Sequence, residues 1–144
     1  ILGERVELAH YPEEVWDDVM AVNLRAPFVL TQELLPLLEK SENASVVFAS
    51  SGVGREARAQ WGAYSVSKIA IEAVSKIFAK ENTYPNIRYN CINPGGTRTA
   101  MRAKAYPDED PKVLPSPEAI MPAYLYLMGD DSLALNGESI DAQD

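Results

Sequence analysis

Three side chains with the chemistry of an acid/base site lie within the segment SGVGREARAQWGAYSVSK, residues 51 to 68. Ser51 is followed thirteen positions later by Tyr64, and Lys68 comes four positions after the tyrosine. On a helix that spacing puts Lys68 one turn beyond Tyr64 on the same face. A phenol loses its proton near pH ~10, and a neighbouring ammonium favours the phenolate. The pair therefore suits proton transfer, and Ser51 would hydrogen-bond the oxygen of a substrate carbonyl or alcohol.

Taken alone, a tyrosine and a lysine at this spacing are ordinary helix surface in a chain with seven tyrosines. The elements around them argue for a site. Ser51 follows VVFAS, residues 46 to 50, a β-branched run typical of a buried strand. Residues 61 to 81 return to helical spacing, so the pair lies on a helix directly after that strand.

The segment from Pro12 to about Lys40 has apolar residues at helical spacing and predicts a long amphipathic helix. Pro27 inside it should bend the helix near Asn23. A second strand is expected in IRYNCI, residues 87 to 92, and the sequence NPGG ends it.

The carboxyl-terminal third of the chain begins with a polar, proline-rich segment, residues 103 to 115, which is expected to form a surface loop or lid. Ser116 then caps a helix that Gly129 closes, and NGESIDA reads as a turn with a final strand. Helices that alternate with strands demand a parallel sheet with right-handed crossovers. We therefore expect an α/β fold with a doubly wound, Rossmann-like parallel sheet, in which Ser51 and the NPGG turn face one crevice at the carboxyl ends of the strands.

Composition excludes several classes of function. The formal net charge of -8 disfavours nucleic acids and anionic membrane surfaces as partners, and no apolar run approaches the ~20 residues of a membrane span. The single cysteine, Cys91, is expected to pack within a strand, and the single histidine, His10, to lie in a solvated turn. No metal site is expected, and a cytoplasmic protein is the default.

Together these motifs make the sequence similar to the short-chain dehydrogenase/reductase family, over essentially the whole chain. The resemblance is carried by VNL around Asn23, VVFASSG with Ser51, YSVSK with Tyr64 and Lys68, and NPGGTRT. The wider wording, WGAYSVSK, YNCINPGGTRTAMRA and YLYLMGDDS, looks most like the YciK-like oxidoreductases of proteobacteria, which are often described as similar to 3-oxoacyl reductases.

The resemblance implies a role for each site residue. Tyr64 would be the general acid in reduction and the base in oxidation, Lys68 would lower its pKa and hold the nicotinamide ribose, and Ser51 would position the substrate oxygen. Asn23 would hold a water at the helix bend and so link Lys68 to solvent. The residues expected to shape the nicotinamide side of the cofactor pocket are Pro94, Gly95, Thr97 and Thr99.

The cofactor implied is NAD or NADP, the substrate is a small carbonyl compound or alcohol, and the assembly is a homodimer or homotetramer. Residues 1 to 144 are expected to be the carboxyl-terminal, catalytic part of a single domain. The family's glycine-rich strand, turn and helix, and an Asn-Ala-Gly turn before ILGE, do not occur in this sequence. Such a fragment is expected to be inactive by itself.

The sequence also departs from the family in two places. Thr97 stands where an aliphatic residue is usual, and Ala142 with Gln143 stand where many relatives have Gly-Gly after the aspartate. The second departure leaves the local turn and a subunit contact open.

Two alternative functions and the substrate also remain open. One is an epimerase or dehydratase of the broader superfamily, and the other is a non-catalytic module that dimerises through the long helices, with Trp16 and Phe28 as anchors or as core. Residues around the loop 100 to 115 are expected to cover the pocket, and two arginines on the turn before Tyr64 are expected to be solvated. The covering residues are Met101, Arg102, Tyr106 and Leu114, the candidates for the lining are Val53, Trp61 and Gly62, and the two arginines are Arg55 and Arg58.

Overall fold

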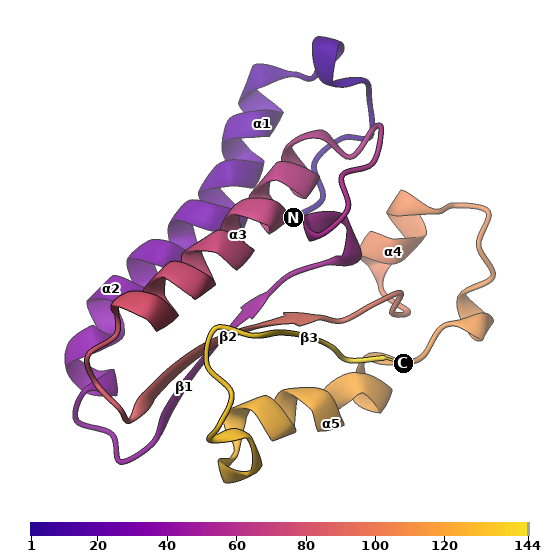
Figure 1. Ribbon diagram of the computed structural model, residues 1–144. Coiled ribbons are helices and arrows are strands. Elements are labelled where there is room, and N and C mark those ends of the chain that lie inside the picture. Colours follow the sequence, from indigo (N-terminus) through magenta and orange to yellow (C-terminus); the bar gives the residue numbers. More distant parts are fainter. Residues whose placement is uncertain (144) are drawn as a thin grey trace.

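The computed structural model describes residues 1–143 and contains one parallel sheet between two layers of helices (Figure 1). Its strands are β1 (Ala44–Ala49), β2 (Ile87–Asn93) and β3 (Ser139–Asp141), in the order β1-β2-β3. Strand β1 pairs with β2 from Ala44 opposite Ile87 to Ala49 opposite Ile92, and β2 pairs with β3 over three residues. The predicted α/β fold with parallel strands is confirmed.

The helices before β2 cover one face of the sheet. They are α1 (Glu13–Met20), α2 (Ala26–Leu38) and α3 (Gly62–Glu81), and Figure 1 shows α1 and α2 running beside α3. The opposite face carries α5 (Pro117–Met128), which is tied to the strands through its last turn. There Ser45 Oγ donates to Leu127 O at 2.7 Å, and just after the helix Arg88 Nη1 donates to Ser132 Oγ at 2.6 Å.

The predicted long helix from residue 12 to residue 40 is interrupted where the sequence requires it. Between α1 and α2 the backbone takes a π-helical turn, Ala21–Arg25, in which Ala26 N donates to Ala21 O. Asn23 lies in this turn, and its carbonyl would normally accept from the residue four positions on. That residue is Pro27, which has no N–H to give. The π-turn relieves the mismatch, since such turns mark places where the α-helical ladder is broken.

The segment predicted to be a loop from residue 103 to residue 115 is more ordered than expected. It overlaps a short helix, α4 (Ala100–Ala105), and contains one turn of 3-10 helix, Pro111–Val113. Thr99 Oγ1 accepts from Arg102 N at 3.1 Å and caps α4. The prediction missed the start of α4 because the prolines and acidic residues that follow dominate the composition of the window.

Three further 3-10 turns complete the chain, at Leu8–His10, Gly52–Gly54 and Asp130–Ser132. The main core joins α3 to the sheet through Ile71, Phe48, Ile87 and Tyr89, and Cys91 is buried within it as predicted. Strand β2 is buried along six of its seven residues, since helices lie over both of its faces. His10 is exposed, also as predicted.

Candidate active site

Two adjacent serines end β1, and the structure gives them different environments. Ser50 is buried, and its Oγ donates to Glu72 Oε1 at 2.6 Å. Ser51 is half-buried and lines a cavity that Tyr64 also lines. The turn Gly52–Gly54 follows and packs on α3 at Gly54, where a Cβ would lie 2.9 Å from both Lys68 O and Ser50 Oγ. Glycine at this point lets the Ser51 segment approach α3 closely.

Tyr64 and Lys68 lie one turn apart on α3, as predicted. Tyr64 is 6% exposed, and Lys68 Nζ lies 5.6 Å from the centroid of its ring. Burial raises the pKa of the Tyr64 phenol, and a hydrogen bond with Ser51 partly opposes that rise. Burial also lowers the pKa of the Lys68 ammonium, which donates to Ala49 O at 2.8 Å. The contacts of this chain thus favour a protonated phenol, and a lowering of its pKa by Lys68 stays a prediction.

Asn23 is buried at the π-turn and contacts α3 at Ser67. Its Nδ2 donates to Ser67 Oγ at 3.2 Å and to Ile1 O at 2.8 Å. Ser67 Oγ in turn donates to the Tyr64 carbonyl at 2.7 Å. The side chain of Asn23 therefore holds the first segment of the chain and α3 together, and its own main chain lacks the usual donor at Pro27.

The turn after β2 lies beside Ser51 and also lines the cavity. Gly95 has φ +69°, a left-handed conformation that glycine adopts without strain. Thr97 is buried, and its Oγ1 donates to Pro94 O at 3.2 Å. Thr99 continues the turn into α4, and the carboxyl ends of β1 and β2 open into the same cavity, as the parallel topology predicted.

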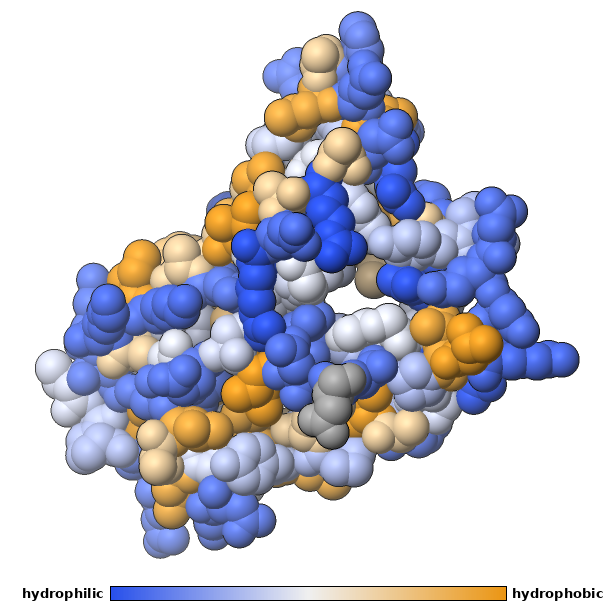
Figure 2. All heavy atoms as spheres, turned by 45° about the vertical axis from the view of Figure 1, so that its right-hand side comes forward, coloured by the Kyte–Doolittle hydropathy of each residue, from blue (hydrophilic) through white to orange (hydrophobic). Residues whose placement is uncertain are grey.

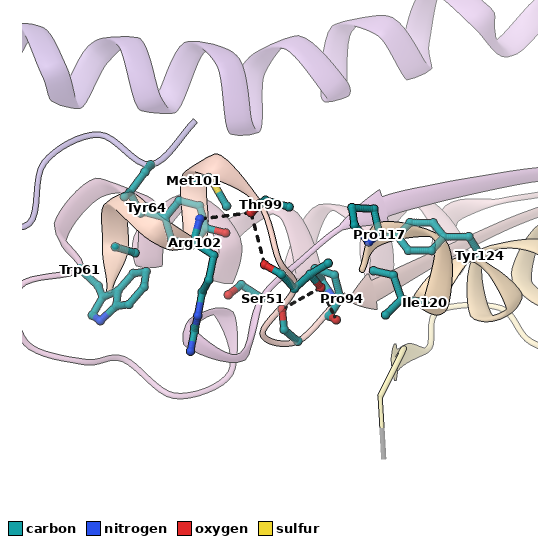
Figure 3. Close-up of a pocket in the computed structure, with 14 residues that line it drawn as sticks. Ser51, Trp61, Tyr64, Pro94, Thr99, Met101, Arg102, Pro117, Ile120 and Tyr124 are labelled. Carbon is teal, nitrogen blue, oxygen red and sulfur yellow. Dashed lines mark hydrogen bonds between the residues drawn. The ribbon is translucent and has the colours of Figure 1, made fainter. Parts of the chain in front are cut away.

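The cavity has a volume of about 290 Å³. Figure 2 shows the surface hollowed on the side of the molecule that carries α4, and Figure 3 shows Tyr64 and Trp61 on one side of the cavity and residues of α5 on the other. Six predicted site residues line it: Ser51, Tyr64, Pro94, Gly95, Thr97 and Thr99. Its other lining residues are Leu2, Trp61, Met101, Arg102, Ala105, Pro117, Ile120 and Tyr124. Lys68 and Asn23 are not among the described residues that line the cavity.

Aromatic and arginine side chains build the outer wall. The Trp61 and Tyr106 rings lie 5.9 Å apart, and the Arg5 guanidinium lies 4.6 Å from the Trp61 ring. Arg102 lies 3.8 Å from the Tyr106 ring, and its Nε contacts Glu109 Oε2 at 2.6 Å. Because Glu109 pairs with it, Arg102 brings little net positive charge to the cavity lining.

Three other residues predicted for the substrate pocket are not among those that line the cavity. Val53 is buried in one cluster with Trp61 and Tyr64, Leu114 lies against Gly96, and Gly62 faces the Tyr11 ring. Of the two predicted anchors, Phe28 packs on Phe78 with ring centroids 6.2 Å apart. Trp16 packs edge-on against Tyr11 at 6.0 Å.

Arg55 is exposed, as predicted, and it is also paired with two carboxylates. Arg55 Nη1 lies 2.8 Å from Asp141 Oδ2, and its Nε lies 3.5 Å from Glu72 Oε1. Glu72 is buried and also accepts from Ser139 Oγ at 2.9 Å. Arg58, by contrast, pairs only with the exposed Glu56.

Sequence reasoning also missed a role for Gln143, although it noted the residue as a departure. Gln143 Nε2 donates to Pro94 O at 2.6 Å and to Gly96 O at 3.1 Å. The side chain therefore bonds to the same turn that lines the cavity. Residues 1–143 hold no cluster of three or more histidine, cysteine or carboxylate side chains that would bind a metal ion. Among the same residues, no helix has both the length and the apolar character needed to cross a bilayer.

This geometry agrees with comparison against known protein families. The model of the short chain dehydrogenase family matches residues 2–110, and the chain belongs to this family. That range contains Asn23, Ser51, Tyr64, Lys68 and the whole turn after β2.

The chain is similar to named members of the family. It is 54% identical to the uncharacterized oxidoreductase YciK of Escherichia coli strain K12 over 99% of this chain and 56% of that protein. It is 33% identical to the 3-oxoacyl-[acyl-carrier-protein] reductase FabG of Thermotoga maritima over 92% of this chain and 57% of that protein. A short chain dehydrogenase from Escherichia coli CFT073, solved in complex with NADPH, superposes with a TM-score of 0.96 at 54% identity, over 100% of this chain and 60% of that one. The chain thus spans somewhat more than half the length of the relatives it matches.

Proposed function

We propose that the protein to which these residues belong is a nicotinamide-dependent oxidoreductase that interconverts a carbonyl compound and a secondary alcohol. The observation that carries this proposal is that Ser51 and Tyr64 line one cavity with the turn Pro94–Thr99, with Lys68 one helical turn beyond the phenol. A lone Tyr-x-x-x-Lys pair on a helix surface would not share a cavity with a strand-end serine and a glycine turn. Membership of the short chain dehydrogenase family supports the same reaction.

The acid/base work is assigned to Tyr64. A phenol is protonated at neutral pH and burial raises the pKa of Tyr64 further, so Tyr64 can donate a proton to the carbonyl oxygen of the substrate during reduction. In the direction of oxidation the phenolate accepts that proton from the alcohol. Ser51 hydrogen-bonds the same oxygen and keeps it within reach of the phenol, and Lys68 favours the phenolate when oxidation requires it.

The residues present fit a nicotinamide dinucleotide. One wall of the cavity offers main-chain groups and hydroxyls of the turn Pro94–Thr99, and the facing wall offers the apolar surfaces of Ile120 and Tyr124. That donor set suits a flat ring with a carboxamide at its edge. Lys68 would hold the ribose, since an ammonium carries three donors and its bond to Ala49 O uses one. When bound, the cofactor would supply or accept the hydride. NADPH is the form to test first, because a similar structure contains it.

Asn23 is assigned to the supply of protons. The missing N–H of Pro27 leaves the carbonyl at the π-turn without its usual donor, and a water there would have an acceptor. That water would connect Lys68 with solvent, so that the proton given up by Tyr64 is replaced.

The substrate class follows from the cavity wall. Leu2, Trp61, Met101 and Ala105 are apolar, and Arg102 is neutralised by Glu109. We propose an uncharged, largely apolar group next to the reacting carbonyl, which is compatible with the similarity to a 3-oxoacyl reductase.

The assembly and the domain organisation are also proposals. The large apolar side chains that are exposed on α2 and α3 are Phe28, Leu30, Leu34, Leu37, Val66, Ile69 and Ile77, which suits a homodimer or homotetramer. Within the described residues, strand β1 has a hydrogen-bonded neighbour on only one side. We propose that residues 1–144 are the carboxyl-terminal part of one domain, and that a preceding glycine-rich segment pairs with β1 and binds the cofactor pyrophosphate.

The proposed reaction is tested by Tyr64→Phe in the full-length protein, with NADPH and a panel of aliphatic and aromatic ketones. General acid catalysis is typically worth ~10²–10⁴ in rate, so turnover should fall by at least about a hundredfold while NADPH affinity changes little. Tyr84→Phe, at an exposed tyrosine remote from the cavity, is the matched control and should keep full activity. Turnover by Tyr64→Phe at the wild-type rate would refute the assignment.

A further inference from the structure

Gln143 follows the end of β3 and reaches across to the turn that ends β2. Its Nε2 donates to Pro94 O at 2.6 Å and to Gly96 O at 3.1 Å, and it lies 3.4 Å from Thr97 Oγ1. A primary amide carries two N–H donors, so one side chain can serve both carbonyls at once. The two bonds join residues on either side of Gly95.

The turn is shaped to receive this side chain. Gly95 has φ +69°, and a Cβ added there would lie 2.8 Å from Gln143 Nε2 and 3.0 Å from its Cδ. Any side chain at position 95 would therefore displace the carboxamide, besides straining the backbone. Gly95 and Gln143 fit each other, and the choice of glycine here serves the contact as well as the turn.

Neighbouring residues of the same segment hold the beginning of the turn. Ala142 N donates to Asn93 O at 2.9 Å, and Asn93 Nδ2 donates to Asp141 Oδ1 at 2.6 Å. Asn93 Oδ1 accepts from Gly95 N at 3.1 Å. Residues 141–143 thus anchor the turn from Asn93 to Thr97. The sequence Pro-Gly-Gly has no side chain of its own that could fix it, and a free glycine pair is costly to order.

We propose that Gln143 is a positioning residue, which holds the turn Pro94–Thr97 in the conformation that lines the cavity and thereby sets the affinity for the nicotinamide. The first part concerns contacts within this chain, and the second rests on the proposed function. Gln143 acts through the turn and contacts neither the phenol nor the hydroxyl of Ser51.

The first experiment needs no activity. Amide hydrogen exchange is followed by mass spectrometry in a peptide that covers residues 92–99 of the full-length protein, for wild type and Gln143→Ala. Loss of two hydrogen bonds should speed exchange in the turn by about tenfold or more, since each bond contributes ~1 kcal/mol. Gln32→Ala, at an exposed glutamine on α2, is the matched control and should leave this peptide unchanged. Exchange in Gln143→Ala at the wild-type rate would overturn the proposal.

The second experiment measures the dissociation constant of NADP⁺ by calorimetry. Gln143→Ala and Gln143→Gly should weaken binding about tenfold and raise the KM for the cofactor more than they lower kcat, while Gln32→Ala does neither. Faster exchange in the turn together with unchanged NADP⁺ affinity would overturn the link to the cofactor. A wild-type protein that binds no nicotinamide would refute the proposed function instead, and the exchange experiment would still decide whether Gln143 holds the turn.

A third variant separates positioning by hydrogen bonds from simple packing. In Gln143→Glu an ionised carboxylate would face the carbonyls of Pro94 and Gly96 and could only accept, whereas its protonated form can donate to one of them. The ratio of variant to wild-type dissociation constants should therefore be larger at pH 8 than at pH 5, by at least about threefold. A ratio close to one at both pH values would mean that the side chain only fills space.

Discussion

The two serines at the end of β1 differ by one position and are expected to differ in function. Ser51 forms a hydrogen bond that lowers the pKa of Tyr64 against the larger effect of burial. Removing it by Ser51→Ala should raise that pKa further. The alkaline limb of the pH–rate profile for carbonyl reduction, which requires the protonated phenol, should then move to higher pH, and oxidation of an alcohol should need a higher pH.

The control for this experiment is Ser50→Ala. Ser50 bonds to Glu72 and not to Tyr64, so its loss should lower the free energy of unfolding by ~1–3 kcal/mol without moving the alkaline limb. If the alkaline limb shifts equally in Ser51→Ala and Ser50→Ala, the two serines do not have separate functions.

The thiol of Cys91 is expected to make the free energy of unfolding depend on pH in the alkaline range. Burial raises the pKa of its thiol from 9.0 to about 11, so the folded state holds the proton that the unfolded state releases first. This contribution to stability is fully present below pH 9 and is lost as the pH rises toward 11. Urea unfolding at pH 8 and at pH 10.5 should show a larger loss for wild type than for Cys91→Ala. Equal losses would mean that the thiol titrates alike in both states.

At the scale of elements, the role of the π-turn between α1 and α2 can be tested by replacing each of two prolines with alanine. Pro27→Ala restores an N–H to the residue that faces the Asn23 carbonyl, and this should favour a regular helix. We expect stability that is unchanged or higher, and a kcat at least several-fold lower, because the site assigned to the water is closed. Pro36→Ala, in the same helix and away from the site, is the control and should keep kcat. Full activity of Pro27→Ala would mean that turnover does not depend on the π-turn.

Arg55 and Arg58 are expected to contribute unequally to the free energy of unfolding. Arg55 pairs with Glu72 and Asp141 at the ends of the strands, and this set of ion pairs is called the strand-end network. Arg55→Ala would leave the buried Glu72 without its cation, which should cost ~1–3 kcal/mol in the free energy of unfolding. Arg58 pairs with Glu56 at the surface, so Arg58→Ala should change stability by no more than about 0.5 kcal/mol. Urea unfolding of both variants measures the difference. A larger loss for Arg58→Ala would mean that the network is not structural.

The elements also explain what the sequence could predict. The spacing of apolar residues and the helix cap located β1, α3, β2 and α5. These signals are local, as in the apolar runs Val46–Phe48 and Ile87–Ile92 and the cap at Ser116. The shared cavity of Ser51 and Tyr64 followed from parallel topology. Contacts between segments far apart in the chain were out of reach. Arg55 with Asp141 and Gln143 with Pro94 join residues more than forty positions apart, and no local pattern distinguishes them from solvated side chains.

At the scale of the whole molecule, the strands of the sheet differ in how many hydrogen-bonded neighbours they have. Among residues 1–143, strand β2 has neighbours on both sides, whereas β1 has a hydrogen-bonded neighbour on only one side. Helix α3 carries Tyr64 and Lys68, the turns after β1 and β2 line the cavity, and the proposed preceding segment would complete the dinucleotide pocket. A 144-residue chain that folds would therefore keep the geometry of Tyr64 and Lys68 and lack most of the contacts to the adenosine half of a cofactor.

This division of the pocket predicts how two forms of the protein bind NADPH. The 144-residue chain, expressed by itself and checked against a mass of 15.8 kDa, should bind NADPH at least about a hundredfold more weakly than the full-length protein, because pyrophosphate contacts at a glycine-rich helix terminus supply much of the affinity. Calorimetry on both forms measures this, and sedimentation of the short chain reports its association. Tight binding by a short chain that stays monomeric would mean that these residues complete a pocket unaided. Tight binding that appears only with association would mean that a second copy supplies the missing wall, and the sheet edge at β1 would then be the first place to look for it.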